Sequence, residues 1–128
     1  MKIEHLALWT RDLENMKRFY EKYFGMTAGE RYYNPQKHFS SYFLTFSHGA
    51  RLELMHRSDI RSGKDDPART YGFTHFAISV GSRDKVDHLT RILREAGYDI
   101  PGEPRVTGDG YYESVICDPE GNRVEITE

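Results

Sequence analysis

The chain has 128 residues, of which 38% are hydrophobic and which include 9 Tyr and 7 Phe, so it is long and apolar enough to fold as one domain rather than to stay disordered. Charged residues make up 30% and the formal net charge is -2, which gives no electrostatic reason to expect nucleic acid or an anionic membrane as a partner. The single cysteine, Cys117, excludes an intrachain disulfide. No apolar run reaches the length of a membrane span, and residues 1–5 carry no apolar signal region. We therefore expect a cytoplasmic protein.

The hydrophobic pattern predicts strands and helices in the same order twice along the chain. Strands are predicted near residues 2–9, 27–34, 40–47 and 50–56, and again near 73–80, 98–106, 111–117 and 122–127. Helices are predicted over 13–24 and 83–96, where apolar residues recur with helical spacing. The expected N-cap residues are Asp12 and Ser82, and the expected stops are Gly25 and Gly97.

Two similar segments begin the two halves. Residues 3–9 resemble residues 73–80, and both start a mostly apolar run that contains one histidine. These histidines, His5 and His75, lie 70 positions apart. The repeat therefore places one imidazole at the start of the first strand in each half.

Two similar segments also end the halves. Residues 46–54 resemble residues 118–126, with Gly, Arg and Glu recurring at an offset of 72. The glycine marks a tight turn, and the alternating residues after it predict a strand. This strand carries Glu53 in the first half and Glu125 in the second.

The repeat predicts an α+β fold of two tandem βαβββ units. The first unit spans about 1–57, the second about 73–128, and a polar linker covers about 58–72. The small offset changes between elements are explained by loop insertions.

Four residues of the repeat are candidate metal ligands. Two similar units usually pack about a pseudo-twofold axis, which would bring His5 to face His75 and Glu53 to face Glu125. If the first and last strands of each unit are neighbours, one histidine and one glutamate converge from each half. Two imidazoles and two carboxylates suit a borderline divalent ion.

A plainer interpretation of the same residues is structural. Glu53 and Glu125 each stand between apolar residues, which is what any half-buried strand shows. The recurrence of both residue types in both halves favours the metal site. Tyr42 and Tyr112 also lie 70 positions apart, and we hypothesise that they flank this site symmetrically.

With these residues in place, the chain resembles the vicinal oxygen chelate superfamily over its whole length. The superfamily includes glyoxalase I, fosfomycin-resistance proteins, extradiol dioxygenases, methylmalonyl-CoA epimerase and bleomycin-resistance proteins. The resemblance rests on the repeated unit, the two histidines, Glu53 and the final hairpin 118–122 with its Gly-Asn-Arg-Val-Glu ending. It implies one glyoxalase-like domain over 1–128, with a mixed, curved sheet around a central metal site.

The ligand set is similar to that of glyoxalase I, in which each unit contributes a histidine and a glutamate. The resemblance therefore implies a lyase or isomerase, like lactoylglutathione lyase, that acts on a small oxygenated substrate through a metal-stabilised enediolate. It implies Glu125 as the base, with Glu53 as its symmetric counterpart, and the choice between them stays open. The implied cofactor is zinc or nickel, with manganese, cobalt or iron(II) as alternatives.

Other functions remain open from the sequence. A dioxygenase, an epimerase or a thiol transferase of the same superfamily would use a similar site, and a drug-binding module would need no metal. The resemblance also implies a homodimer. Whether the two His–Glu pairs meet within one chain or across two chains is left open.

Overall fold

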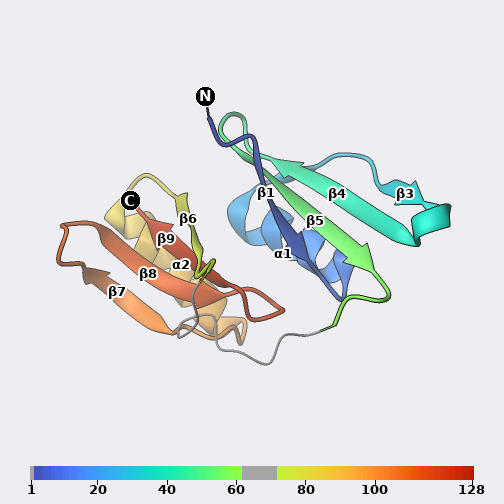
Figure 1. Ribbon diagram of the computed structural model, residues 1–128. Coiled ribbons are helices and arrows are strands. Elements are labelled where there is room, and N and C mark those ends of the chain that lie inside the picture. The colour runs from blue at the N-terminus through green and yellow to red at the C-terminus, as the bar shows by residue number, and fades with distance from the viewer. Residues whose placement is uncertain (1, 62–71) are drawn as a thin grey trace. The chain divides into compact units, whose positions relative to one another are not determined.

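Each half of the chain folds as one α-helix against its own mixed sheet (Figure 1). The computed structural model describes residues 2–61 and 72–128. The chain divides into two units, Met1–Gly63, here called unit one, and Lys64–Glu128, called unit two. Most of the predicted linker, about 58–72, lies outside the described residues.

Unit one is built around strand β5. Its described elements are β1 (His5–Trp9), α1 (Leu13–Phe24), β2 (Thr27–Ala28), β3 (Tyr32–Asn34), the 3-10 turn η1 (Pro35–Lys37), β4 (Phe39–Thr45) and β5 (Arg51–Arg57). Strand β5 pairs in parallel with β1 and antiparallel with β4. Strands β2 and β3 both pair with β4, which makes the sheet mixed.

Helix α1 covers one face of this sheet. It begins at Leu13, because the side chain of Asp12 accepts a hydrogen bond of 2.9 Å from the N–H of Asn15. It ends at Phe24, because Gly25 takes the left-handed conformation with φ of 65°. The buried side chains of the helix are Leu13, Met16, Phe19 and Tyr20. The helix packs against β4 and β5, where burial of one Leu, Met or Phe side chain contributes about 1.5–3 kcal/mol.

The strand predicted over 27–34 is interrupted. The structure has two short strands, β2 and β3, with residues 29–31 between them. Gly29 still donates its N–H to the carbonyl oxygen of Phe43 at 2.9 Å, but it has no side chain to pack on the sheet. The prediction of one continuous strand was therefore wrong at this point.

Unit two repeats the arrangement with its own sheet. Its described elements are β6 (Phe76–Ser79), α2 (Arg83–Glu95), β7 (Gly102–Val106), β8 (Tyr112–Cys117) and β9 (Arg123–Thr127). The strand order is β6-β9-β8-β7, with β6 and β9 parallel. Strand β7 begins at Gly102 rather than near 98, because Pro101 has no N–H to donate to a neighbouring strand.

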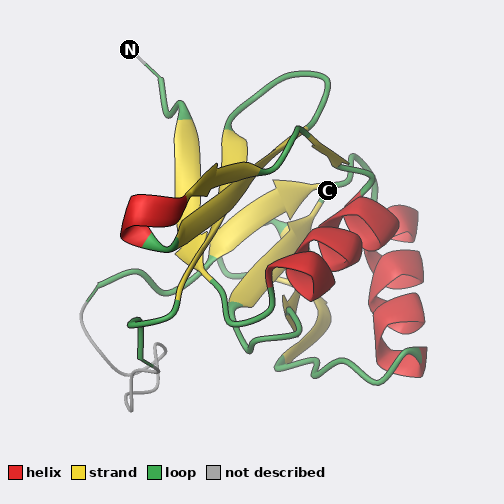
Figure 2. Cartoon of the chain, turned by 90° about the vertical axis from the view of Figure 1, so that its right-hand side faces the viewer, coloured by secondary structure: helices red, strands yellow, loops and turns green. Residues whose placement is uncertain are grey.

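Helix α2 covers one face of the unit-two sheet, as α1 does in unit one (Figure 2). It begins after Ser82, whose hydroxyl accepts a hydrogen bond from the N–H of Lys85 at 3.4 Å. Gly97 follows the helix with φ of 87°, as the sequence predicted. The buried residues Thr90 and Ser114 join α2 to β8 through a 2.7 Å hydrogen bond between their hydroxyls.

The first and last strands of each unit are parallel neighbours in the same register. Ala7 lies opposite Glu53 in unit one, and Ala77 lies opposite Glu125 in unit two. A histidine stands two residues before each of these alanines, so it projects from the same sheet face as the glutamate. The α+β class and the tandem βαβββ order predicted from the sequence are confirmed, with one sheet in each unit.

Candidate metal centre

The structure brings His5 and Glu53 together on the face of the unit-one sheet that lies away from α1. Leu52 and Leu54 are buried on the helix side, so Glu53 between them must point to the opposite side. The imidazole Nε2 of His5 lies 3.8 Å from Oε2 of Glu53, and the Glu53 side chain is 15% exposed.

His75 and Glu125 form the corresponding pair in unit two. Val124 and Ile126 are buried beneath α2, which again leaves the glutamate between them on the face away from the helix. Nε2 of His75 lies 3.2 Å from Oε1 of Glu125, and the Glu125 side chain is 19% exposed. The two pairs therefore repeat the same residue types, the same register and the same ring nitrogen.

The donor set and its spacing fit one divalent ion. Two ligand atoms bound at about 2.0–2.2 Å from one ion lie roughly 3.0–3.5 Å apart. The unit-two pair falls in that interval at 3.2 Å, and the unit-one pair is slightly wider at 3.8 Å. In the described part of the chain, no group of three or more His, Cys, Asp or Glu side chains is placed to hold a metal ion. Each unit by itself therefore brings together two candidate ligands.

Unit one adds a second carboxylate beside its histidine. Glu4 accepts a hydrogen bond from Nδ1 of His5 through Oε2, and its Oε1 pairs with the guanidinium of Arg51. The hydrogen bond from His5 is the main cause that lowers the pKa of the Glu4 carboxyl, and the bond from Arg51 also contributes. Glu4 is therefore an ionised acceptor that binds Nδ1 of His5. The other ring nitrogen, Nε2, faces Glu53.

Glu113 is a polar neighbour of Glu125 that the sequence reasoning missed. In the antiparallel ladder Val115 lies opposite Glu125, so Glu113, two residues earlier on β8, projects from the same face. Its side chain is 13% exposed and pairs with Arg105 at 3.3 Å. Burial, followed by repulsion from Glu125, raises the pKa of Glu113. Glu113 could have been identified from the alternation of side chains along β8 if the register of β8 with β9 had been known.

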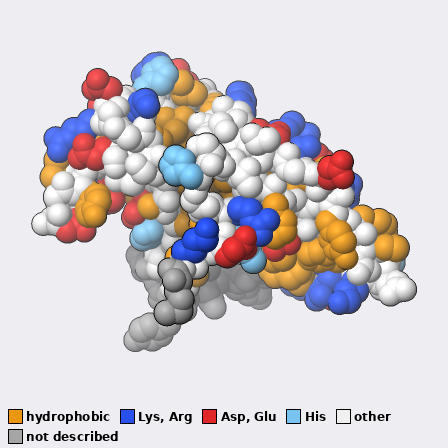
Figure 3. All heavy atoms as spheres, turned by 90° about the horizontal axis from the view of Figure 1, so that it is seen from above, with side chains coloured by type: hydrophobic (Ala, Val, Ile, Leu, Met, Phe, Trp, Pro, Cys, Tyr) orange, Lys and Arg blue, Asp and Glu red, His pale blue; other side chains and the backbone are white. Residues whose placement is uncertain are grey.

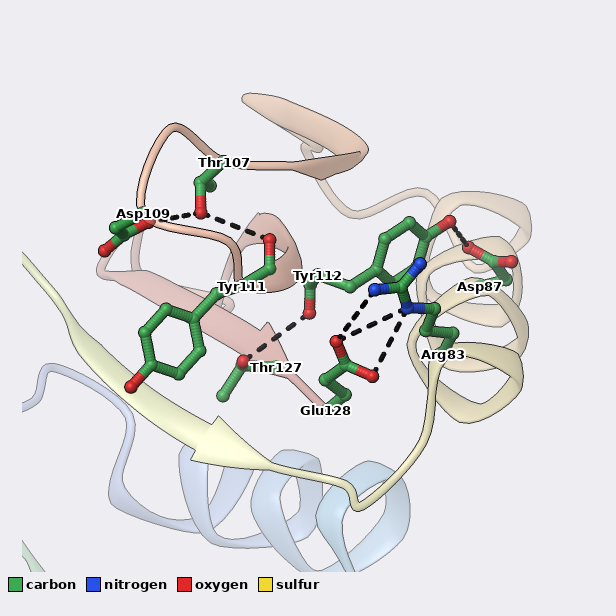
Figure 4. A network of polar contacts seen from close by, with 8 residues as sticks. All are labelled: Arg83, Asp87, Thr107, Asp109, Tyr111, Tyr112, Thr127 and Glu128. Carbon is green, nitrogen blue, oxygen red and sulfur yellow. Dashed lines mark hydrogen bonds and ion pairs between the residues drawn. The ribbon is translucent and has the colours of Figure 1, made fainter.

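The hypothesis that Tyr42 and Tyr112 flank the metal site is wrong. The hydroxyl of Tyr42 donates to Glu14 on α1 at 2.8 Å, and that of Tyr112 donates to Asp87 on α2 at 2.6 Å. Figure 4 shows the Tyr112 ring turned toward α2 and stacked beside Arg83, whose guanidinium carbon lies 5.1 Å from the ring centre. Both tyrosines thus lie on the helix side of their sheets, opposite to the glutamates.

The sequence matches the Glyoxalase/Bleomycin resistance protein/Dioxygenase superfamily over residues 2–126. The chain belongs to this superfamily. The resemblance drawn from the repeated His and Glu positions is therefore confirmed at the level of the superfamily. A search of curated proteins found no match.

Solved structures share the fold of this glyoxalase-superfamily chain at low sequence identity. The trypanothione-dependent glyoxalase I of Leishmania major is 23% identical with a TM-score of 0.80, over 100% of this chain and 86% of that chain. A glyoxylase/bleomycin resistance protein/dioxygenase domain from Frankia is 20% identical with a TM-score of 0.80, over 99% of this chain and 90% of that one. Glyoxalase I from Zea mays is 23% identical with a TM-score of 0.77, over 98% of this chain and 44% of that chain. This chain therefore spans less than half of the maize protein.

The surface of this superfamily member carries charges of both signs. On the face drawn in Figure 3, Lys and Arg side chains are interspersed with Asp and Glu. This mixture agrees with the balanced composition of the chain. Within residues 2–61 and 72–128, neither helix is both long enough and apolar enough to cross a membrane.

Proposed function

We propose that this protein is a metal-dependent lyase or isomerase of the glyoxalase I type, acting on a small oxygenated substrate. The observation that carries the proposal is the pair of matched His–Glu contacts, at 3.8 Å in unit one and 3.2 Å in unit two. A purely structural role at the start of a half-buried strand does not require a histidine. It explains even less why a histidine stands at the matching place in both units. Superfamily membership supports the same conclusion.

The proposed ligands of one divalent ion are His5, Glu53, His75 and Glu125. Because each unit supplies two of them, the complete site needs one unit-one pair and one unit-two pair. Two neutral imidazoles and two carboxylates also neutralise the double charge of the ion, and they suit zinc or nickel as well as manganese, cobalt or iron(II).

The proposed chemistry is a proton transfer on the substrate. When bound, the ion would supply Lewis acidity to two adjacent substrate oxygens, which acidifies the neighbouring carbon. Glu125 is the proposed base that takes the proton from that carbon and returns it to the adjacent carbon, and Glu53 is its counterpart in unit one. Both carboxylates are at least four-fifths buried, at 15% and 19% exposure, which limits competition from water.

Metal content tests the proposed site directly. The protein is purified without chelator and without a nickel affinity tag, beside a Glu53→Gln, Glu125→Gln double variant. A double variant Glu95→Gln, Glu103→Gln serves as the matched control, because it removes two exposed carboxylates that pair with arginines on the surface. We expect about one divalent ion for each pair of half-sites in the wild type and in the control, and loss of the ion in the first variant. A wild type that binds none of the five candidate ions would overturn the proposal.

Turnover tests the reaction. The hemithioacetal of methylglyoxal and glutathione is the first substrate, assayed with each candidate metal restored to metal-stripped protein. Formation of the isomerised thioester would establish the glyoxalase I type. Oxygen consumption with a catechol in the iron(II) form would instead assign the dioxygenase type to the same site.

The proposed homodimer is tested by mixing two inactive variants. If each site combines unit one of one chain with unit two of its partner, a hybrid of Glu53→Gln and Glu125→Gln chains contains one intact site. If each site lies within one chain, every site in the hybrid is defective. Recovery of metal binding and activity after co-refolding therefore distinguishes the two arrangements, and light scattering gives the oligomeric state.

A further inference from the structure

The imidazole of His5 belongs to a closed ring of contacts among four side chains, those of His5, Glu4, Arg51 and Phe43. Glu4 bridges His5 and Arg51, using a different carboxylate oxygen for each. The guanidinium of Arg51 stacks over the ring of Phe43, with its carbon 4.0 Å from the ring centre. Phe43 in turn meets the His5 ring edge to face, at 5.4 Å between centres and 88° between planes. These contacts hold the imidazole through its Nδ1 atom and through its ring contact with Phe43.

The backbone fixes the members of this ring in place. Arg51 lies opposite His5 in the parallel ladder of β1 and β5, and Phe43 lies opposite Glu53 in the antiparallel ladder of β4 and β5. The N–H of Arg51 also donates to the carbonyl oxygen of Glu4 at 3.0 Å, which extends the pairing to the residue before β1. Three neighbouring strands therefore set the position of the imidazole.

Stability alone does not account for the ring. Glu4 and Arg51 are 54% and 38% exposed, so solvent screens their ion pair and the pair adds little to stability. Nε of Arg51 is buried and has no acceptor within the described residues, which is unfavourable. Orientation of the imidazole is therefore the better explanation of the arrangement.

Unit two has a different set of residues at the same positions. Thr74 stands where unit one has Glu4, and Val115 lies opposite Glu125 where Phe43 lies opposite Glu53. The carboxylate and the aromatic ring are both replaced, and only the arginine recurs, as Arg123. The two halves of the candidate site are therefore chemically unequal.

We propose that Glu4 is a positioning residue, which with Arg51 and Phe43 fixes His5 with Nδ1 protonated and Nε2 free to bind the ion. An ionised carboxylate only accepts hydrogen bonds, so its contact with Nδ1 selects the Nδ1–H form of the ring. A carboxylate behind a ligating histidine also makes the ring a stronger ligand. Unit one then presents a preorganised pair to the ion. This inference rests on the proposed metal site.

Metal affinity provides the first test. Glu4→Thr introduces the residue of unit two, and Glu4→Gln keeps an acceptor oxygen but removes the charge. Dissociation constants for Zn²⁺ are measured by competition with a chromophoric chelator, with Glu103→Gln as the control for loss of an exposed carboxylate paired with arginine. We expect affinity to fall about 10- to 100-fold in Glu4→Thr, less in Glu4→Gln, and not at all in the control.

The tautomer of His5 provides a second test that needs no metal. Long-range proton–nitrogen NMR spectra of the metal-stripped protein report which ring nitrogen carries the proton, and the His5 signals are assigned by their loss in His5→Gln. We expect the Nδ1–H form in the wild type and a shift toward the Nε2–H form in Glu4→Thr. A merely structural role for Glu4 would leave the tautomer unchanged.

The two tests separate failure of this inference from failure of the proposed function. Equal zinc affinity in the wild type and Glu4→Thr would overturn the role of Glu4 while the metal site stands. An Nε2–H form in the wild type would overturn it as well. A wild type that binds no ion but holds His5 in the Nδ1–H form would overturn the proposed function and support the orienting role.

Discussion

His75 and Glu125 bring a ring nitrogen and a carboxylate oxygen to 3.2 Å from two neighbouring parallel strands. The contact depends on the register in which Ala77, two residues after the histidine, lies opposite Glu125. A shift of one residue would turn the glutamate to the helix side of the sheet. The register thus decides whether the candidate ligands of unit two can meet.

The proposed base can be recognised from its kinetic effect. We expect Glu125→Gln to lower kcat by about 10²–10⁴-fold, because an amide cannot accept the proton in the transition state. KM should change far less, since the base is needed mainly after the substrate has bound. Steady-state kinetics on the metal-loaded enzyme measure both, with Glu53→Gln assayed in parallel. A variant that raises KM alone would contradict the assignment.

The contact between Tyr42 and Glu14 predicts a pH-dependent stability. The ammonium of Lys17, followed by the hydroxyl of Tyr42, lowers the pKa of Glu14 in the folded state. The stabilisation is therefore fully present above the ordinary glutamate value of 4.5 and is lost as the pH falls through the lowered folded value. Because the Glu14 side chain is 42% exposed, we expect Tyr42→Phe to cost only about 1 kcal/mol at neutral pH.

Urea unfolding between pH 3 and 7 measures this effect. The difference in unfolding free energy between the wild type and Tyr42→Phe should shrink toward zero as Glu14 is protonated. Tyr111→Phe, which changes a ring that is 57% exposed, is the control and should track the wild type throughout. A difference that stays constant with pH would show that Tyr42 acts only through packing.

The buried hydroxyls of Thr90 and Ser114 should be energetically coupled. Thr90 Oγ1 donates to the carbonyl oxygen of Val86 at 2.7 Å and lies 2.7 Å from Ser114 Oγ, and both residues are fully buried. Thr90→Val leaves the buried Ser114 hydroxyl without this partner, at a cost of about 1–3 kcal/mol, whereas Ser114→Ala leaves Thr90 its bond to Val86 and should cost less. The double variant should cost less than the sum of the two. A double-mutant cycle from thermal or urea unfolding that shows strict additivity would argue against the pairing.

Asp118 should be the most sensitive residue of the final hairpin. It is 4% exposed, and its Oδ1 accepts from the N–H groups of Glu120 at 3.0 Å and Asn122 at 2.9 Å. Asp118→Ala removes these charge-assisted bonds, so we expect a loss of about 2–3 kcal/mol in unfolding free energy. Asp109→Ala, in the exposed turn before Tyr111, is the control and should stay within about 0.5 kcal/mol of the wild type. Equal losses of unfolding free energy in both variants would show that the hydrogen bonds of Asp118 add nothing beyond those of an exposed turn.

The sequence predicts the elements of this fold better than their contacts. Helix 13–24 was predicted to the residue, because its apolar stripe and its caps, Asp12 and Gly25, are local signals. The break that begins at Gly29 and the late start of β7 after Pro101 were missed. The apolar pattern of a strand continues through a glycine that has no side chain to pack and a proline that has no N–H to pair.

The same distinction between local pattern and tertiary contact holds for the candidate site. The four proposed ligands could be found from the repeat, because the recurrence of one residue type at matching places in both halves can be seen without knowledge of the strand register. The orientation of Tyr42 and the presence of Glu113 could not, because each depends on which residue of the neighbouring strand it faces. Glu4 was predicted inside the first strand but stands one position before β1, and the sequence pattern gives no sign of its bonds to His5 and Arg51.

Every described strand pairing lies within one of the two sheets, and each sheet holds its own His–Glu pair. A gene segment that encodes one unit therefore encodes one His–Glu pair and the whole sheet that positions it. A lineage can then exchange one carboxylate for an amide by a single-codon change while every strand stays paired. The side chains of the candidate site can therefore change without loss of the strand pairing that holds either unit together.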